Sequence, residues 1–100
     1  MKKIVTILLP CLNEEETLDT CIKRIKTTMK NSKYKDCYEI LVCDNGSTDN
    51  SIKICKKNRV KYTVCKEKGY GSTLINGINV SETKYLVMLD CDLSYDDRDI

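Results

Sequence analysis

The side chains with the clearest chemical potential in this sequence are two aspartates, Asp90 and Asp92, in the stretch YLVMLDCDLSYDD. Alternate residues of an extended chain point to the same side, so the two carboxylates can reach one point while Cys91 faces away. Carboxylate oxygens suit Mg²⁺ or Mn²⁺, which also bind phosphate oxygens. An acidic turn that ends a strand is the simpler interpretation, and these three residues alone do not separate the two.

The elements that would position these aspartates follow from the spacing of the apolar residues. Four short apolar runs rich in β-branched residues predict strands, at residues 3–10, 38–44, 60–65 and 84–90. The segments between them carry apolar residues three and four apart, which predicts helices within residues 13–30, 45–58 and 66–83. Repeated strand–helix alternation favours right-handed crossovers and a parallel sheet. The predicted fold class is therefore α/β, a three-layer Rossmann-like parallel sheet in the order β-α-β-α-β-α-β, formed by one domain over residues 1–100.

Residues at the predicted element boundaries give further expectations. Pro10 should end the first strand, and Asn13 is a plausible N-cap of the helix that follows it. Ser47 or Thr48 should cap the second helix, with Ile52 on its buried side. Each strand would then lead into its helix through a short polar loop.

Polar segments follow all four predicted strands. They are PCLNEE, DNGSTD, CKEKGYGS and DCDLSYDD. Ligands of open parallel sheets bind beyond the carboxyl ends of the strands, and these ends share one edge. This shared position strengthens the case for a metal site at Asp90 and Asp92 and for a ligand-facing Asp44. The Ser-Thr-Asp that follows Gly46 is more simply explained as a set of helix-capping residues.

Three further segments carry weaker signals. The KGYGS segment around Lys68 and Gly69 places glycines before a helix, where backbone N–H groups can approach a phosphate. It lacks the spacing of a P-loop or a dinucleotide fingerprint, so a solvated loop is the simpler interpretation. Asn13–Glu15 could orient a ribose or base, although first-turn helix charges explain its glutamates more simply. Residues 23–35, rich in Lys and Arg, form either a solvated helix face or a patch that contacts anionic lipid head groups.

Composition limits the class of protein. With 100 residues, 41% hydrophobic and 32% charged, the chain is long enough for one globular domain. A net charge of +2 does not favour nucleic acid as a partner. No apolar run approaches the roughly 18 residues that cross a bilayer. Seven cysteines without a CxxC pair favour buried thiols in a reducing cytoplasm over a disulfide framework or a zinc site.

Four motifs, taken together, resemble the N-terminal half of family 2 glycosyltransferases with the GT-A fold. The motifs are LPCLNEE, ILVCDNGSTDNS, KGYGSTLINGI and YLVMLDCDLSYD. Their GYGS and DxDxSYD forms are most similar to the branch that transfers sugars to dolichyl or polyprenyl phosphate. The resemblance implies inverting transfer of a sugar from a UDP- or GDP-sugar to an acceptor, of which a polyprenyl phosphate is one candidate. It also implies Mg²⁺ or Mn²⁺ as cofactor.

The same resemblance implies a set of site residues. The nucleotide sugar would be bound by Pro10, Leu12, Asn13, Glu14, Asp44, Asn45, Lys68, Gly69, Asp90, Cys91 and Asp92. The metal would be held by Asp90 and Asp92. Many family members carry a second Asp where Asn45 stands, so the contact with the base would differ. The general base that deprotonates the acceptor is expected beyond Ile100.

These implications make the chain the apparently truncated, donor-binding part of a longer enzyme. We expect it to bind a sugar nucleotide without turning it over by itself. The full-length protein is expected in the cytoplasm, with the cytoplasmic face of a membrane as one location. A parallel sheet that stops after its fourth strand leaves an open edge, and homo-oligomerisation is one way to cover it.

Two alternative functions remain open at this point. One is a sugar nucleotidyltransferase, although no Gly-rich signature with a basic residue follows the first strand. The other is a non-catalytic nucleotide-binding or receiver-like α/β module. In a receiver the acidic pair would follow the first strand, whereas here it follows the fourth. Turnover of a nucleoside triphosphate with a sugar phosphate would support the first alternative, and phosphorylation of Asp44 would support the second.

Overall fold

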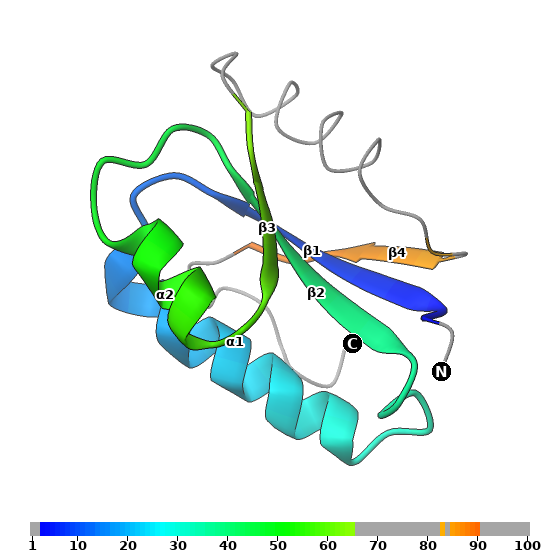
Figure 1. The fold of residues 1–100 in the computed structure, drawn as a ribbon. Coiled ribbons are helices and arrows are strands. Elements are labelled where there is room, and N and C mark those ends of the chain that lie inside the picture. Colours follow the sequence, from blue (N-terminus) through cyan, green and yellow to red (C-terminus); the bar gives the residue numbers. More distant parts are fainter. Residues whose placement is uncertain (1–2, 66–82, 84, 91–100) are drawn as a thin grey trace.

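The computed structural model describes residues 3–65, 83 and 85–90 of the chain. These residues form β1 (Val5–Cys11), α1 (Glu15–Lys30), β2 (Tyr38–Asp44), α2 (Ser51–Lys57), β3 (Lys61–Val64) and β4 (Tyr85–Met88). The strands make one parallel sheet in the order β3-β2-β1-β4 (Figure 1). The predicted parallel α/β fold is thus confirmed, whereas the third predicted helix lies, apart from residue 83, outside the described residues.

β1 lies at the centre of the sheet, between β2 and β4. Its register places Cys11 opposite Asp44 on one side and Leu8 opposite Met88 on the other. Because all pairs are parallel, the four strands end at one edge of the sheet, here called the carboxyl edge, and begin at the opposite edge, the amino edge. The polar segments that follow the strands therefore start from the same edge, as the sequence predicted.

Pro10 does not end β1, contrary to the prediction, because the strand continues to Cys11. Even-numbered carbonyls of β1 face β4, as shown by Leu8, which accepts a hydrogen bond of 3.0 Å from the Leu89 N–H. Pro10 belongs to this even-numbered set, so the N–H that proline lacks would point past the end of β4 and not towards β2. Pairing of β1 with β2 is unaffected, which explains how a central strand tolerates a proline.

The helices α1 and α2 lie on the same face of the sheet (Figure 1). The buried stripe of α1 has the predicted spacing and consists of Leu18, Cys21, Ile22, Ile25 and Met29. Alternate strand residues point to the same side, and those that meet this stripe are Val5, Ile7, Leu9, Cys11, Ile40 and Val42. This packing fixes α1 against β1 and β2, so the loop between β1 and α1 is held at the carboxyl edge.

The opposite face of the two central strands is also buried. Leu8, Leu41 and Cys43 form a second cluster there, and each is shielded from solvent. Burial on both faces is typical of a parallel sheet and agrees with the nearly continuous apolar runs of the strands. The six cysteines among the described residues are free thiols, and all of them except Cys37 are buried, as the composition predicted.

The first helix begins one residue later than predicted. Glu14, and not Asn13, occupies the N-cap position of α1. Asn13 has a φ of 52°, in the left-handed region that asparagine tolerates better than most residues. Asn13 is therefore a turn residue, while Glu15 and Glu16 supply the acidic first turn that the helix dipole favours.

The second helix also departs from the prediction. α2 begins at Ser51, so neither Ser47 nor Thr48 caps it. Its buried residues are Ser51 and Cys55, which lie four apart and so on the same side of the helix. The half-buried Ile52 lies beside this side and outside the core clusters, so its predicted inward position is wrong.

β3 and β4 are the outer strands of the described sheet, and both carry exposed apolar side chains. These are Val64 on β3 and Tyr85, Leu86 and Met88 on β4. The open edge expected from the sequence, and its coverage by a second copy of the chain, stay predictions. Neither of the two described helices is both long enough and apolar enough to span a bilayer.

Candidate functional site

The carboxyl edge brings the ends of β1, β2 and β3 to the same level. The Asn45 N–H donates to the Cys11 carbonyl at 2.9 Å, and the Cys65 N–H donates to the Asp44 carbonyl at 2.8 Å. The side chain of Asn45 adds a further link, because its Nδ2 donates to the Cys65 carbonyl at 3.4 Å. The segments that follow the three strands thus leave the sheet side by side.

Asp44 closes the turn that follows β2. Its side chain is only 1% exposed. The N–H groups of Gly46 and Ser47 donate to its Oδ2 at 3.1 and 2.9 Å, and the Ser47 hydroxyl donates to its Oδ1. Gly46 has a φ of 88°, a conformation that glycine adopts readily. Both carboxylate oxygens therefore hold this turn, and a contact between Asp44 and a nucleotide stays a prediction.

Asn13 joins the loop after β1 to the loop after β2. Its N–H donates to Ser47 Oγ at 2.9 Å. Its Oδ1 accepts the Thr48 N–H at 2.8 Å and the Thr48 hydroxyl at 3.4 Å. Since Ser47 also donates to Asp44, a continuous chain of hydrogen bonds runs from β2 to the loop that precedes α1.

The N-termini of α1 and α2 are linked by carboxylates from both loops. Asp49 Oδ2 accepts the Glu15 N–H at 3.1 Å, and Asp49 Oδ1 accepts the N–H and hydroxyl of Ser51 at 2.9 and 2.6 Å. Glu15 Oε2 accepts the N–H and Nδ2 of Asn50 at 3.3 and 3.0 Å. Ser51 Oγ accepts the Glu14 N–H at 3.2 Å. Negative charge at helix N-termini is favourable, so these bonds stabilise both helices.

The same hydrogen bonds change the acidity of Asp49. Desolvation raises its pKa, but hydrogen bonds donated by the hydroxyl and N–H of Ser51 and by the N–H of Glu15 outweigh that effect. The net result is a pKa below the usual 3.8. The protein therefore keeps a negative charge between the two helix N-termini.

Asp90 is the member of the predicted metal pair that lies within the described residues. The Leu89 N–H donates to the Leu8 carbonyl at 3.0 Å, which continues the register of β4 on β1 and brings Asp90 level with Pro10. Asp90 is exposed. Two strand spacings separate it from β2, so the backbones of Asp90 and Asp44 lie roughly 10 Å apart along the carboxyl edge.

The remaining predicted site residues fall into two groups. Leu12 is 50% exposed at the carboxyl edge, and Glu14 is half-buried at the start of α1. The residues that lie outside the described part of the chain are Lys68, Gly69, Cys91 and Asp92. Within the described residues no group of three or more His, Cys, Asp or Glu side chains could hold a metal ion, so Asp90 would need partners from elsewhere.

Sequence reasoning did not single out Ser51, and it assigned Asp49 and Glu15 only to their own helices, as a capping residue and a first-turn charge. The bonds that these residues make between the two loops were not predicted. A short polar residue close to a helix start is a recognisable capping signal, and Asp49 does precede Ser51 by two residues. The hydrogen bond that Asp49 accepts from the Glu15 N–H could not be predicted in this way, because the two residues are 34 apart in sequence.

Known proteins are similar to this chain in sequence and in fold. The family model described as "Glycosyl transferase family 2" matches residues 6–100. The chain belongs to glycosyltransferase family 2. This membership confirms the resemblance carried by the four motifs and decides against a sugar nucleotidyltransferase or a receiver module.

Curated glycosyltransferases match most of this chain. An uncharacterized glycosyltransferase of Mycobacterium tuberculosis is 33% identical over 96 residues, which cover 96% of this chain and 40% of that protein. The dolichol-phosphate mannosyltransferase of Pyrococcus furiosus is 30% identical over 96 residues, which cover 91% of this chain and 26% of that protein. The chain thus spans less than half the length of these relatives.

Solved structures of glycosyltransferases show the same fold. Glucosyl-3-phosphoglycerate synthase of M. tuberculosis, crystallised with Mn²⁺, UDP and glucosyl-3-phosphoglycerate, matches with a TM-score of 0.75 at 23% identity, over 90% of this chain and 34% of that one. The same enzyme crystallised with UDP matches with a TM-score of 0.77 at 22% identity, over 91% and 34%. The predicted GT-A arrangement is confirmed.

Proposed function

We propose that the carboxyl edge binds the nucleoside diphosphate of a sugar donor, and that the full-length protein transfers the sugar to an acceptor with inversion. The main support is the cross-linking of the loops after β1 and β2, with Asp90 at the same edge of the sheet. Membership of glycosyltransferase family 2 points to the same chemistry.

The cross-linked loops after β1 and β2 provide a preorganised surface to which the nucleotide can bind. Because Ser47 already bonds both Asp44 and Asn13, little conformational entropy is lost when a ligand binds to these loops. Leu12 offers exposed apolar surface to the base or ribose. Asn45, at the end of β2, lies where a contact with the base is expected.

Asp90 fits a divalent cation. Its carboxylate is an exposed oxygen ligand of the kind that Mg²⁺ and Mn²⁺ prefer, and Asp92 is the second ligand that the sequence supplies. When bound, the cation offsets the charge that develops on the departing diphosphate. The residues of this chain bind the diphosphate and orient the sugar.

The similar proteins support a proposal for the donor and the acceptor. We favour a UDP-sugar over a GDP-sugar, because glucosyl-3-phosphoglycerate synthase was crystallised with UDP and Mn²⁺. A polyprenyl phosphate is the proposed acceptor, because the P. furiosus relative is a dolichol-phosphate mannosyltransferase. The full-length protein would then act at the cytoplasmic face of a membrane. Transfer of labelled sugar from a UDP-sugar to polyprenyl phosphate by the full-length protein tests both assignments.

Calorimetric titration of the 100-residue chain tests the donor site. UDP and GDP are each titrated with and without Mn²⁺ into wild type, Asp90→Asn and Asp92→Asn. We expect UDP to bind in the presence of Mn²⁺ and each variant to bind at least about tenfold more weakly, which corresponds to about 1.4 kcal/mol.

Asp36→Asn is the matched control, because Asp36 is an exposed aspartate that precedes β2 at the amino edge. It removes the same charge and should leave UDP affinity unchanged. Equal affinity of wild type and Asp90→Asn, or no binding of either nucleotide with Mn²⁺ present, would overturn the proposal.

A further inference from the structure

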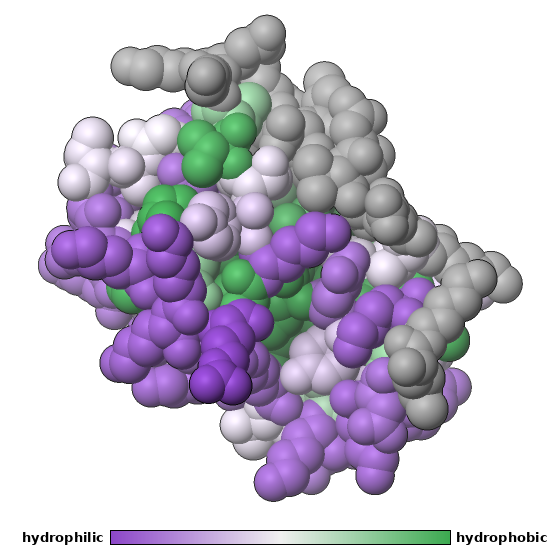
Figure 2. Space-filling model, viewed as in Figure 1, coloured by the Kyte–Doolittle hydropathy of each residue, from purple (hydrophilic) through white to green (hydrophobic). Residues whose placement is uncertain are grey.

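A second charged region lies at the amino edge of the sheet. A hollow of about 450 Å³, here called the amino-edge pocket, is lined by five basic residues, Lys3, Lys26, Lys35, Arg59 and Lys61, and by a single acid, Glu39. These residues come from α1, from the turn after α2, and from in and around the starts of the first three strands. Figure 2 shows hydrophilic residues gathered on this face, where α2 leads into β3 and where β2 begins.

The positive charge of the amino-edge pocket is not neutralised from within. None of its five basic side chains forms an ion pair in the described part of the chain. Glu39 Oε1 accepts a hydrogen bond from Thr6 Oγ1 at 3.0 Å. Val5 and Ile7, on either side of Thr6, face the helices, so the Thr6 side chain points to the opposite face of the sheet. The hydrogen bond therefore holds the Glu39 carboxylate towards that opposite face. The Lys26 ammonium donates to the Asn58 carbonyl at 2.5 Å, which holds one cation in place.

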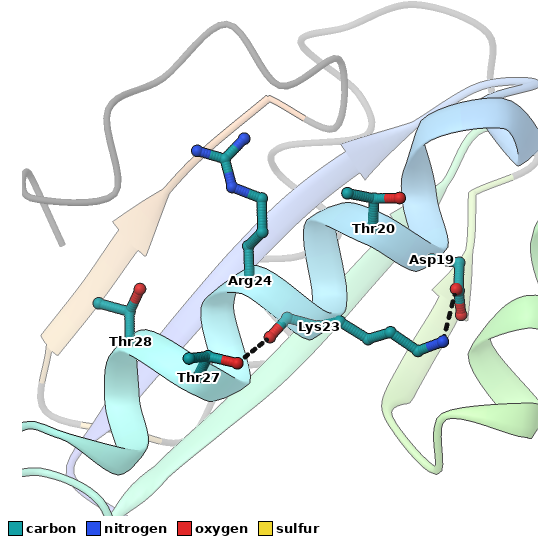
Figure 3. A pocket seen from close by; sticks show the side chains of 6 residues that line it. All are labelled: Asp19, Thr20, Lys23, Arg24, Thr27 and Thr28. Atoms are coloured by element: carbon teal, nitrogen blue, oxygen red, sulfur yellow. Dashed lines mark hydrogen bonds and ion pairs between the residues drawn. The ribbon is translucent and has the colours of Figure 1, made fainter.

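A second hollow among the described residues differs from the amino-edge pocket in how its charges are paired. This second hollow, of about 400 Å³, lies along α1 and includes Asp19, Lys23 and Thr27 in its lining (Figure 3). There the Lys23 ammonium pairs with the Asp19 carboxylate at 2.8 Å, and the Thr27 hydroxyl donates to the Lys23 carbonyl. In that hollow the Lys23 ammonium is neutralised by an acid of the same lining, whereas the basic side chains of the amino-edge pocket have no ion-pair partner among the described residues.

The helix dipole does not explain the cluster. Cations near helix C-termini are favourable, which accounts for Lys30, Lys56 and Lys57 in the last turns of α1 and α2. Lys3, Lys35 and Lys61 have no such reason, because they precede or begin the strands. The helix dipole therefore does not explain why these three lysines line the same hollow.

The amino-edge pocket is separate from the proposed donor site. The seven residues of β1 lie between the two edges, and at about 3.3 Å per residue they keep the two regions roughly 20 Å apart. The carboxyl edge carries acids, among them Glu15, Asp49 and Asp90. A ligand of the amino-edge pocket would thus not compete for the atoms that bind the donor.

We propose that the amino-edge pocket binds a phosphate-bearing anion. A phosphate group carries up to two negative charges and several acceptor oxygens. The ammonium groups of the exposed Lys3, Lys35 and Lys61 and the guanidinium of Arg59 can donate hydrogen bonds to these oxygens. The same chemistry is offered by a phospholipid head group and by a soluble phosphate ester, and the experiment below distinguishes them.

Inorganic phosphate is titrated into the isotopically labelled 100-residue chain at constant ionic strength, with backbone amide shifts as the readout. We expect saturable shifts at Lys35, Tyr38 and Lys61. The triple variant Lys3→Gln/Lys35→Gln/Lys61→Gln should bind at least tenfold more weakly. These three lysines are exposed and bond no other described side chain, so the fold should survive.

The matched control is Lys53→Gln/Lys56→Gln/Lys57→Gln, which removes the same charge from α2 and leaves the lining intact. It should bind phosphate as wild type does. Equal weakening of both triple variants would show attraction by net charge alone and overturn the proposal. Shifts confined to the Asn45–Ser51 segment, or no saturable shift, would overturn it as well.

Vesicles identify the source of the phosphate. Cosedimentation with phosphatidylcholine vesicles that contain phosphatidic acid, lost in the pocket variant and kept in the control, supports a lipid head group. Saturable phosphate binding without vesicle binding supports a soluble phosphate ester. Cosedimentation that is identical for both triple variants would contradict a lipid role for this pocket.

Discussion

Asp49 Oδ2 lies 3.1 Å from the backbone nitrogen of Glu15 and accepts its hydrogen bond, although 34 residues separate the two. An aspartate that precedes α2 thereby caps α1, and Glu15 in return accepts hydrogen bonds from Asn50. This reciprocity has the logic of a capping box, but it operates between two helices and not within one. It ties together the two loops on which the proposed nucleotide site rests.

Replacement of Asp49 by alanine should destabilise the protein by about 2 kcal/mol, because each lost helix cap typically costs about 1 kcal/mol. Urea unfolding followed by circular dichroism measures the loss. Asp36→Ala, at an exposed aspartate with no side-chain hydrogen bond among the described residues, should change stability by less than about 0.5 kcal/mol. If Asp49→Ala unfolds at the same urea concentration as wild type, the two caps contribute nothing to the stability of the protein.

The stability contributed by Asp49 should depend on pH. Its pKa in the folded protein is lowered, since hydrogen bonds from Ser51 and Glu15 outweigh desolvation. A lowered folded pKa means that the stabilisation is complete above the unfolded pKa of about 4 and is lost as the pH falls through the folded value. The stability difference between wild type and Asp49→Asn should therefore be larger at about pH 7 than at about pH 2. A constant difference across this range would contradict the assignment.

The spacing of apolar residues along the sequence correctly predicted those helices and strands that have a clear apolar stripe or run of their own. The apolar stripe from Leu18 to Met29 lies at helical spacing, and the structure buries it as expected. The run Tyr38–Asp44 contains the continuous apolar stretch Ile40–Cys43, and it forms β2 with the predicted limits. Such segments are predictable because burial of one stripe or one run decides their conformation.

The helix starts were not predictable in the same way. Asn13, Ser47 and Thr48 all have side chains that can cap a helix. In the structure, however, Asn13 is bonded to Ser47 and Thr48 in the loop after β2, and Ser47 also bonds Asp44 at the end of β2. Several polar residues near each helix start could serve as its N-cap, and hydrogen bonds between distant segments determine which of them does. Pro10 misled for a related reason, because its missing N–H faces β4, and whether that loss interrupts a strand pairing depends on where β4 ends.

Replacement of Asp44 by asparagine should destabilise the fold and weaken UDP binding together. The buried carboxylate accepts hydrogen bonds from Gly46 and Ser47 at both oxygens, whereas an amide turns one acceptor into a donor that faces other donors. The expected cost is about 1–3 kcal/mol. Urea unfolding and UDP titration of Asp44→Asn measure the two effects. Ser47→Ala, which keeps the carboxylate, should cost less, and the reverse order would contradict this description of the turn.

The buried thiols should resist alkylation. Burial raises the pKa of Cys43 to about 11 and that of Cys55 to about 12, so the reactive thiolate is scarce at both. Treatment with N-ethylmaleimide at neutral pH, followed by peptide mass spectrometry, should label the half-buried Cys37 before the other five cysteines of the described residues. Cys43 and Cys55 should react only after urea is added. Labelling of either at the rate of Cys37 in the native protein would show that it is not buried.

The position of a bound nucleotide–metal complex tests the central claim most directly. Mn²⁺ is paramagnetic and broadens the amide signals of nearby residues, whereas Mg²⁺ does not, so the two complexes with UDP form a matched pair. With UDP–Mn²⁺ we predict loss of signal at Leu12, Leu89 and Asp90, at the carboxyl edge, and full intensity at Lys35 and Lys61, at the amino edge. Broadening that is strongest at the amino edge, or equal at both edges, would contradict a donor site at the carboxyl edge.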